Sequence, residues 1–197
     1  MSATAKAAAM PPTTPVTAPA AAPATAMTGC LAPIDKDGLD TLIAKGRADP
    51  KAVKTLKCRT IAEGRFRHLN MIRDLPPYIV DEPPGLLGDD TAPNPSEASL
   101  AALGSCLAVG IHANAVARGI TVRTLEIELE ADINITAVWG TGDTSPKPVG
   151  FDAVRAKVHL EADAPQEELD GLIAHATRWS PVANTFTKPV GLEVESV

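Results

Sequence analysis

A chain of 197 residues with 45% apolar side chains is long enough to bury the core of one globular domain, and its 3% aromatic content leaves that core to aliphatic residues. The net charge of −6 argues against nucleic acid as a partner, because phosphate binding needs a basic surface. The chain has no uninterrupted apolar run of about 18 residues, so we expect no membrane span.

The chain opens with a segment rich in alanine, proline and threonine. Prolines break up every apolar run in this segment, so it does not resemble a secretory signal, and residues 1–33 are expected to be a disordered tail. Residues 34–197 are expected to form a single domain. Cys30, Cys58 and Cys106 are widely separated and lack metal-ligand spacing. We therefore expect free thiols in a reducing, cytoplasmic setting, with no metal and no cofactor.

The first half of the domain reads as one short helix followed by strands. Leucine and isoleucine spacing predicts a helix over Lys36–Lys45. Segments Lys54–Glu63 and Arg65–Arg73 predict a hairpin that turns at Gly64, and Tyr78–Val80 predicts a third strand. A loop rich in Gly, Pro and Asp then leads to a long helix.

The long helix has clear start and stop signals. Asn94 is a suitable N-cap, Pro95 suits the first helical position, and Glu97 can complete a capping box. Gly119 predicts the end of the helix. Few charged residues interrupt the segment between these signals, so we expect the helix to be buried on most sides.

The second half predicts an α+β layout. Apolar and acidic residues alternate over Leu125–Ile135, which predicts a half-buried strand whose acids face solvent. Trp139–Pro148 is expected to be a loop, followed by a strand over Asp152–Glu161 and a helix over Gln166–Arg178. Leu192 and Val194 are expected to belong to a closing strand, which completes an order typical of α+β folds.

Cys106 is the best candidate for chemistry. It lies mid-helix beside the small residues Gly104, Ser105 and Gly110, which would let a substrate or another backbone approach the sulfur. The helix dipole acts only within the first turn, so a thiolate there would need a cation, for which Arg65 and Arg67 are candidates. A small, inert, buried side chain is the alternative for Cys106.

Several motifs occur in the order and spacing of one known family. Asn94-Pro95 precedes Cys106, which follows the proline by eleven residues. Gly119-Ile120 leads into the long strand, Gly150-Phe151 opens the next strand, and Ser180-Pro181-Val182 follows the last helix. Over roughly residues 54–197 the chain resembles the OsmC/Ohr family.

The resemblance implies an OsmC-like α+β fold in which two antiparallel sheets surround long central helices in an intertwined homodimer. Peroxidases of the family reduce organic hydroperoxides with a reactive cysteine, for which the matching position here is Cys106. That cysteine forms a disulfide with a second cysteine and is recycled by a dithiol. An arginine and a glutamate hold the thiolate ready.

This chain departs from that pattern in three places. Ser180 stands where the family has its second cysteine, and Ser96 stands where the family glutamate follows Asn-Pro. Residues 78–93, where the family arginine is expected, contain no Arg or Lys. Glu97 lies nine residues before Cys106, about half a turn out of phase at roughly 100° per residue.

Other side chains are weaker candidates. Ser180 either forms a hydrogen bond with an oxidised Cys106 or, as the plainer interpretation, caps the turn that starts at Pro181. Trp179, and with it Ser96 and Glu97, are candidates to line a pocket. Cys58 is a less favoured replacement for the second cysteine, and His112 lies about 240° round the helix from Cys106.

The sequence is therefore compatible with two functions. The first is a one-cysteine hydroperoxide reductase that acts through Cys106 and is recycled by an external thiol. The alternative is a non-peroxidase OsmC-like dimer that binds a small apolar ligand in its interface cleft. A purely structural dimer is less favoured than either.

Overall fold

The computed structural model of the protein describes residues 29–141 and 149–196. Most of the expected tail and the end of the loop expected after Trp139 therefore lie outside the described residues. Leu31, which falls within the expected tail, packs against the core, and its amide donates to Val122 O at 3.0 Å. An apolar side chain at Leu31 accounts for this early contact.

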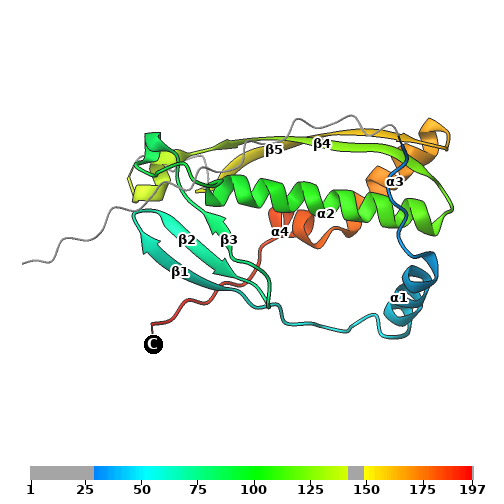
Figure 1. The fold of residues 1–197 in the computed structure, drawn as a ribbon, viewed down its shortest axis with the longest axis horizontal. Helices are drawn as coiled ribbons and strands as arrows, with labels where there is room; N and C mark the ends of the chain where they lie inside the picture. Colours follow the sequence, from blue (N-terminus) through cyan, green and yellow to red (C-terminus); the bar gives the residue numbers. More distant parts are fainter. Residues whose placement is uncertain (1–28, 142–148, 197) are drawn as a thin grey trace, which may run out of the picture.

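Helices and strands follow one another in the order expected of an α+β chain (Figure 1). The elements are α1 (Lys36–Ala48), β1 (Arg59–Gly64), β2 (Arg67–Met71), β3 (Tyr78–Val80), η1 (Pro84–Leu86), α2 (Pro95–Ala117), β4 (Val122–Ile133), η2 (Ile135–Trp139), β5 (Phe151–Ala162), α3 (Gln166–Trp179) and α4 (Pro181–Thr187).

The strands form two antiparallel sheets, one in the order β1-β2-β3 and one that pairs β4 with β5. The β4–β5 sheet runs along the length of α2, whereas the three-stranded sheet lies at one end of that helix (Figure 1). The principal elements that pack against α2 are β4, α3 and α4. The expected α+β fold with two antiparallel sheets and a long central helix is confirmed for the single chain.

The predicted start and stop of α2 are confirmed. Asn94 Oδ1 accepts from Glu97 N at 2.9 Å, and Glu97 Oε2 accepts from Asn94 N at 2.8 Å, which completes the capping box. Gly119 has a φ of 76°, the left-handed conformation that ends many helices. These signals fix where the helix begins, and hence where Cys106 falls along it.

The core lies where α2, α3 and the sheet meet. Ile111 and Leu172 are almost completely buried, and Ala115 and Leu169 lie in the same interior. A Cβ built at Gly110 would lie 3.1 Å from Ala176 Cβ, so α2 and α3 approach closely at this pair of small residues. This close approach brings the end of α3 alongside the middle of α2.

The alternation predicted for β4 is confirmed. Its side chains alternate between half-buried aliphatic and exposed polar positions along the strand. On the exposed face Arg155 of β5 donates to Asp132 at 2.6 and 3.0 Å. The acids of β4 therefore form a solvated face that pairs with basic residues of β5.

The expected closing strand is wrong for the single chain. After α4, residues 189–196 form no strand, and Leu192 and Val194 are 86% and 87% exposed. Their alternation is compatible with a strand, but a strand also needs a partner edge, and within the described residues no edge pairs with this segment.

One helix has the length and mean hydropathy of a membrane span without containing an unbroken apolar run of about 18 residues. Among the described residues α2 alone is long and apolar enough to cross a membrane, with a mean hydropathy of 1.6 over 18 residues. Scattered glycine, serine and asparagine interrupt the apolar residues of α2, so the mean hydropathy is high although no long apolar run is unbroken. One such helix is weak evidence for a membrane span, because α2 also packs against β4, α3 and α4 as a core helix does.

Candidate active site around Cys106

The structure brings Cys106 and Ser180 together, although 74 residues separate them in the chain. Cys106 is half-buried on α2, and Ser180 is only 4% exposed at the junction of α3 and α4. Ser180 Oγ lies 3.1 Å from Cys106 Sγ in hydrogen-bonding geometry. The pair therefore forms a contact between the middle of one helix and the end of another.

The Ser180 hydroxyl is oriented by a second hydrogen bond, in which it caps α4. Its oxygen accepts a hydrogen bond from Ala183 N at 3.0 Å, so Ser180 is the N-cap of α4, as the sequence predicted. Because a hydroxyl has a single proton, that proton remains free for the sulfur. Ser180 thus caps α4 and is at the same time a hydrogen-bond partner of the free Cys106 thiol.

Asn184 holds the turn that carries Ser180. Its side-chain amide donates to Arg178 O at 3.0 Å and to Ser180 O at 2.8 Å. These bonds satisfy carbonyl groups at the end of α3 that have no partner within that helix. The position of the hydroxyl is therefore set by backbone contacts from both helices.

A cavity of about 310 Å³ lies between α2, β5, α3 and α4, and its lining includes chain neighbours of Cys106 but neither Cys106 nor Ser180. Leu103 and Leu107, on either side of Cys106 in the chain, form one wall. Val158 of β5 and Phe186 of α4 contribute to the facing walls. The lining is mostly apolar, so the space suits the hydrocarbon part of a small molecule.

Trp179 does not line this cavity. Its side chain is 68% exposed and lies near His175, with ring centroids 6.2 Å apart, and near the Arg178 guanidinium at 6.0 Å. It borders a separate open depression of about 280 Å³ together with Lys188. The structure thus separates Trp179 from Cys106, although Trp179 directly precedes Ser180.

Ser96 and Glu97 lie at the start of α2, away from the Cys106–Ser180 pair. Both carboxylate and amide of Glu97 are used in the capping box. Ser96 lines another cavity, which it shares with Glu82. These two candidates therefore do not contact the cysteine within one chain.

The two candidate arginines also bind elsewhere. Arg65 Nη1 lies 2.6 Å from Asp89 Oδ1, and Arg67 donates to Glu63 and to Thr91 Oγ1 at 2.8 and 2.7 Å. Both arginines thus hold the loop that precedes α2. Within the described residues of one chain, Cys106 has Ser180 as its hydrogen-bonding side chain and no ion pair.

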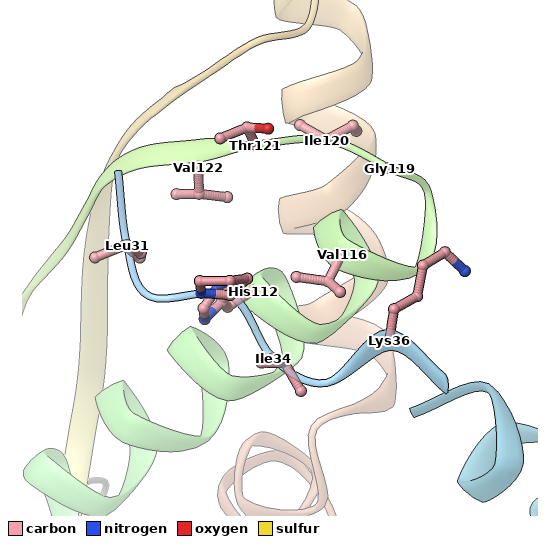
Figure 2. A pocket seen from close by; sticks show the side chains of 10 residues that line it. Leu31, Ile34, Lys36, His112, Val116, Gly119, Ile120, Thr121 and Val122 are labelled. Carbon is pink, nitrogen blue, oxygen red and sulfur yellow. The ribbon is translucent and has the colours of Figure 1, made fainter. Parts of the chain in front are cut away.

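Cys30 and Cys58 are exposed and free. Among the described residues, His, Cys, Asp and Glu side chains form no group of three or more that could hold a metal ion. His112 lines a cavity of about 250 Å³ at the far end of α2, where the segment after Leu31 crosses the helix (Figure 2). Its imidazole is therefore not part of the Cys106 pair.

A buried aspartate organises the loop before α2, and no pattern in the sequence predicted its burial. Asp81 is completely buried and accepts from Glu82 N, Thr91 N and Thr91 Oγ1 at 2.8, 3.1 and 2.7 Å. Burial alone would raise the pKa of Asp81, but the hydrogen bonds, led by the Thr91 hydroxyl, lower it from 3.8 to about 2. The loop is thus held by an ionised side chain.

Acid should weaken the fold through Asp81. Because its pKa is lower in the folded state, the stability that it contributes is present above pH 4 and is lost as the pH falls from about 4 toward 2. Urea unfolding at a series of pH values should show this loss in the wild type. Asp81→Asn should be less stable at pH 7, and its free energy of unfolding should fall less steeply with acid than that of the wild type. An equally steep fall in the two proteins would contradict the assignment.

Comparison with known proteins agrees with the geometry. The model of the family described as OsmC-like protein matches residues 88–195. The chain is similar in fold to an OsmC-like protein from Mycoplasma pneumoniae, with a TM-score of 0.59, 14% identity and coverage of 69% of this chain and 89% of that one.

Two further solved structures are similar in fold. An osmotic stress induced and detoxification response protein from Psychrobacter arcticus has a TM-score of 0.54 at 15% identity, covering 68% of this chain and 90% of its own. An organic hydroperoxide resistance protein OsmC from Legionella pneumophila has a TM-score of 0.50 at 20% identity, covering 69% and 91%. No curated protein gives a significant sequence match.

Proposed function

Because the chain belongs to the OsmC-like protein family, we propose that it reduces organic hydroperoxides with one cysteine, Cys106. The observation that carries the proposal is the hydrogen bond from the buried Ser180 hydroxyl to Cys106 Sγ at 3.1 Å. A donor aimed at sulfur stabilises negative charge there, both on a thiolate and on an oxidised sulfur. The name of the Legionella structure, which concerns organic hydroperoxide resistance, points in the same direction.

The proposed reaction needs only the cysteine and a proton. The Cys106 thiolate attacks the distal oxygen of the hydroperoxide, the O–O bond breaks, and the products are a sulfenic acid and an alkoxide that takes up a proton to become the alcohol. Sulfur is oxidised and the peroxide is reduced by two electrons. The mostly apolar cavity beside Leu103 and Leu107 offers space for the organic group.

An external thiol completes the cycle. It attacks the sulfenic sulfur to give a mixed disulfide and water, and a second thiol releases Cys106 as the thiol with formation of an external disulfide. Ser180 cannot act as the second cysteine. Cys58 is exposed and lies just before β1, a strand whose principal partner is β2 rather than α2. The proposal therefore assigns the reductant to another molecule in a reducing compartment, the cytoplasm.

The proposal includes a homodimer. Along the side of α2 that faces away from the core, Ala101, Ala102, Ser105 and Val109 are exposed, and Val109 is 68% exposed. A stripe of small and apolar residues allows a second helix to approach closely and would be covered by a second copy. Light scattering of the purified protein should give twice the mass of the chain; the mass of a single chain would contradict the dimer.

The cavity also supports a second candidate, a dimer that binds a small apolar ligand without turnover. Two observations favour it: within the described residues of one chain the hydrogen-bond partner of Cys106 is the neutral Ser180 and no cation, and an apolar space of about 310 Å³ lies next to Leu103 and Leu107. In that case a ligand should protect Cys106 from alkylation while peroxide oxidises it no faster than an ordinary thiol.

Oxidation of Cys106 separates the two candidates. Purified protein is titrated with cumene hydroperoxide in the presence of a sulfenic-acid trap, and intact mass and peptide mapping locate the adduct. Near-stoichiometric trapping on Cys106, faster than on a free thiol, is the expected result. Cys106→Ser should abolish the adduct and the consumption of peroxide, whereas Cys58→Ser should leave both unchanged; equal loss in both variants would refute the proposal.

A further inference from the structure

The cavity that Ser96 shares with Glu82 has a volume of about 210 Å³ and lies at the N-terminal end of α2. It is enclosed by η1, the first turn of α2, the end of β4 and η2. Leu86, Ile133 and Val138 give it apolar walls and Trp139 gives it an aromatic one. The Glu82 side chain is its acidic member.

The Glu82 carboxylate has an unsatisfied atom. Its Oε2 is buried and has no hydrogen-bond partner within the described residues. Leaving a buried polar group unpaired is unfavourable, and more so when the group is charged. Glu82 therefore borders a mostly apolar space and also carries a buried oxygen that lacks a donor.

The charges around Glu82 indicate which kind of hydrogen-bond donor would suit its carboxylate. Burial raises the pKa of Glu82, and the nearby charges of Glu97 and Asp81 raise it further, while His68 acts weakly in the other direction. Asp81 is ionised in the fold, since its own pKa is about 2. The field at Glu82 is thus negative, and a cationic hydrogen-bond donor would relieve both the repulsion and the unpaired oxygen.

The walls are held in place without a ligand. The Trp139 ring packs on Phe66 of the β1–β2 turn, with centroids 6.1 Å apart. The Glu82 backbone is fixed on both sides, because its amide donates to Asp81 Oδ1 at 2.8 Å and its carbonyl accepts from Asp90 N at 3.1 Å. A preformed pocket of this kind loses little entropy on binding.

We propose that this cavity binds a small organic amine, with its ammonium group on the Glu82 carboxylate and its apolar body against Trp139. The site is separate from the Cys106–Ser180 pair, and binding there needs no redox chemistry. Aralkylamines such as phenethylamine have the required parts, a cationic head and an apolar body of the right order of size for about 210 Å³.

Trp139 fluorescence gives a direct test. In a Trp179→Phe background, Trp139 is the one remaining tryptophan of the chain. Phenethylamine should change its emission saturably, with a Kd on the order of 1 mM or below for so small a ligand. The neutral analogue 2-phenylethanol should bind at least about 10-fold more weakly, and 3-phenylpropionate should not bind.

Two variants locate the contact. Glu82→Gln should weaken amine binding at least about 10-fold and remove the preference over 2-phenylethanol, whereas the exposed Glu126→Gln should change neither. Ile133→Phe, which fills the cavity from β4, should weaken the amine and the alcohol alike. Circular dichroism and light scattering during each titration report the fold and the mass.

Three outcomes would overturn the proposal. One is the absence of a saturable change with phenethylamine in the folded Trp179→Phe protein. A second is amine binding that Glu82→Gln leaves unaltered. The third is a fall in mass as amine is added, which would mean that a cationic side chain of a second copy occupies the cavity. Cys106→Ser should bind the amine normally, so failure of the peroxidase proposal would leave this result untouched.

Discussion

Replacing Ser180 with cysteine is expected to create a disulfide partner for Cys106 that closes on treatment with an organic hydroperoxide. Ser180 Oγ lies 3.1 Å from Cys106 Sγ, so a sulfur at that place needs to approach by about 1 Å to reach the usual bond length near 2.05 Å. Intact mass should show the loss of two hydrogens in Ser180→Cys and peptide mapping should join the two segments. The wild type should instead retain a sulfenic acid that a trap can capture.

The closed form of Ser180→Cys should also resist unfolding. A bond across 74 residues of chain restricts the unfolded state by about 4 kcal/mol in the chain-entropy model. Reducing agent should remove this gain. The matched control is Thr185→Cys, which adds a thiol on an exposed position of the same short helix and should form no such bond. Equal disulfide yields in the two variants would show that Ser180 does not face Cys106.

Ser180→Ala tests the hydrogen bond itself. The variant removes the donor to sulfur and also the cap of α4, so slower oxidation of Cys106 alone would be ambiguous. Ser180→Thr keeps a hydroxyl and serves as the rescue variant. Recovery of the oxidation rate in Ser180→Thr would assign the effect to the hydroxyl.

Local signals in the sequence were sufficient to place Cys106 on its helix. Asn94 and Glu97 form the predicted capping box, and Gly119 ends the helix in the predicted conformation. Such signals act within a few residues, so they can be read directly from the sequence. The alternation of β4 is equally local, and it too was confirmed.

Contacts between distant segments were harder to predict. The contact of Ser180 with Cys106 joins residues 74 apart, and the sequence suggested it only through the resemblance to a family. Trp179 directly precedes Ser180, yet it is exposed because α3 ends there and its ring turns toward His175. Adjacency in the chain did not therefore predict a shared pocket.

The acids before α2 show a different limit. Asp81-Glu82-Pro83 has the composition of an exposed loop, yet Asp81 is completely buried and one Glu82 oxygen is sealed from solvent. Their burial depends on how the loop folds back on itself and on the two arginines of the neighbouring hairpin. Such packing cannot be predicted from the composition of the loop.

The loop before α2 contains no arginine of its own, but the β1–β2 hairpin supplies two arginines that bond to it. Arg65 lies just before β2 and bonds to Asp89 of the loop, and Arg67 is the first residue of β2 and bonds to Thr91. Thr91 in turn donates to Asp81. The loop without arginines is thus tied to arginines from another element, and its shape governs both Glu82 and the start of α2.

A methyl group at Gly88 should disrupt this loop. A Cβ built there would lie 1.8 Å from the Glu82 carbonyl oxygen and 2.3 Å from its carbonyl carbon. Both atoms belong to the backbone, so no side-chain rotation can relieve the overlap. We expect Gly88→Ala to lower the free energy of unfolding by about 3 kcal/mol, at the upper end of the usual cost of overpacking.

Gly85→Ala is the matched control for Gly88→Ala. Gly85 lies three residues earlier, in η1, and a Cβ there meets nothing within 4 Å, so its effect should stay within about 0.5 kcal/mol. Urea unfolding at pH 7 compares the two variants. Because Asp81 N donates to Pro93 O beside the α2 cap, Gly88→Ala should also loosen the first turn of α2, seen as faster amide exchange there. Equal unfolding midpoints for the two variants would mean that the loop yields easily, and the buried carboxyl of Glu82 would then have no fixed place.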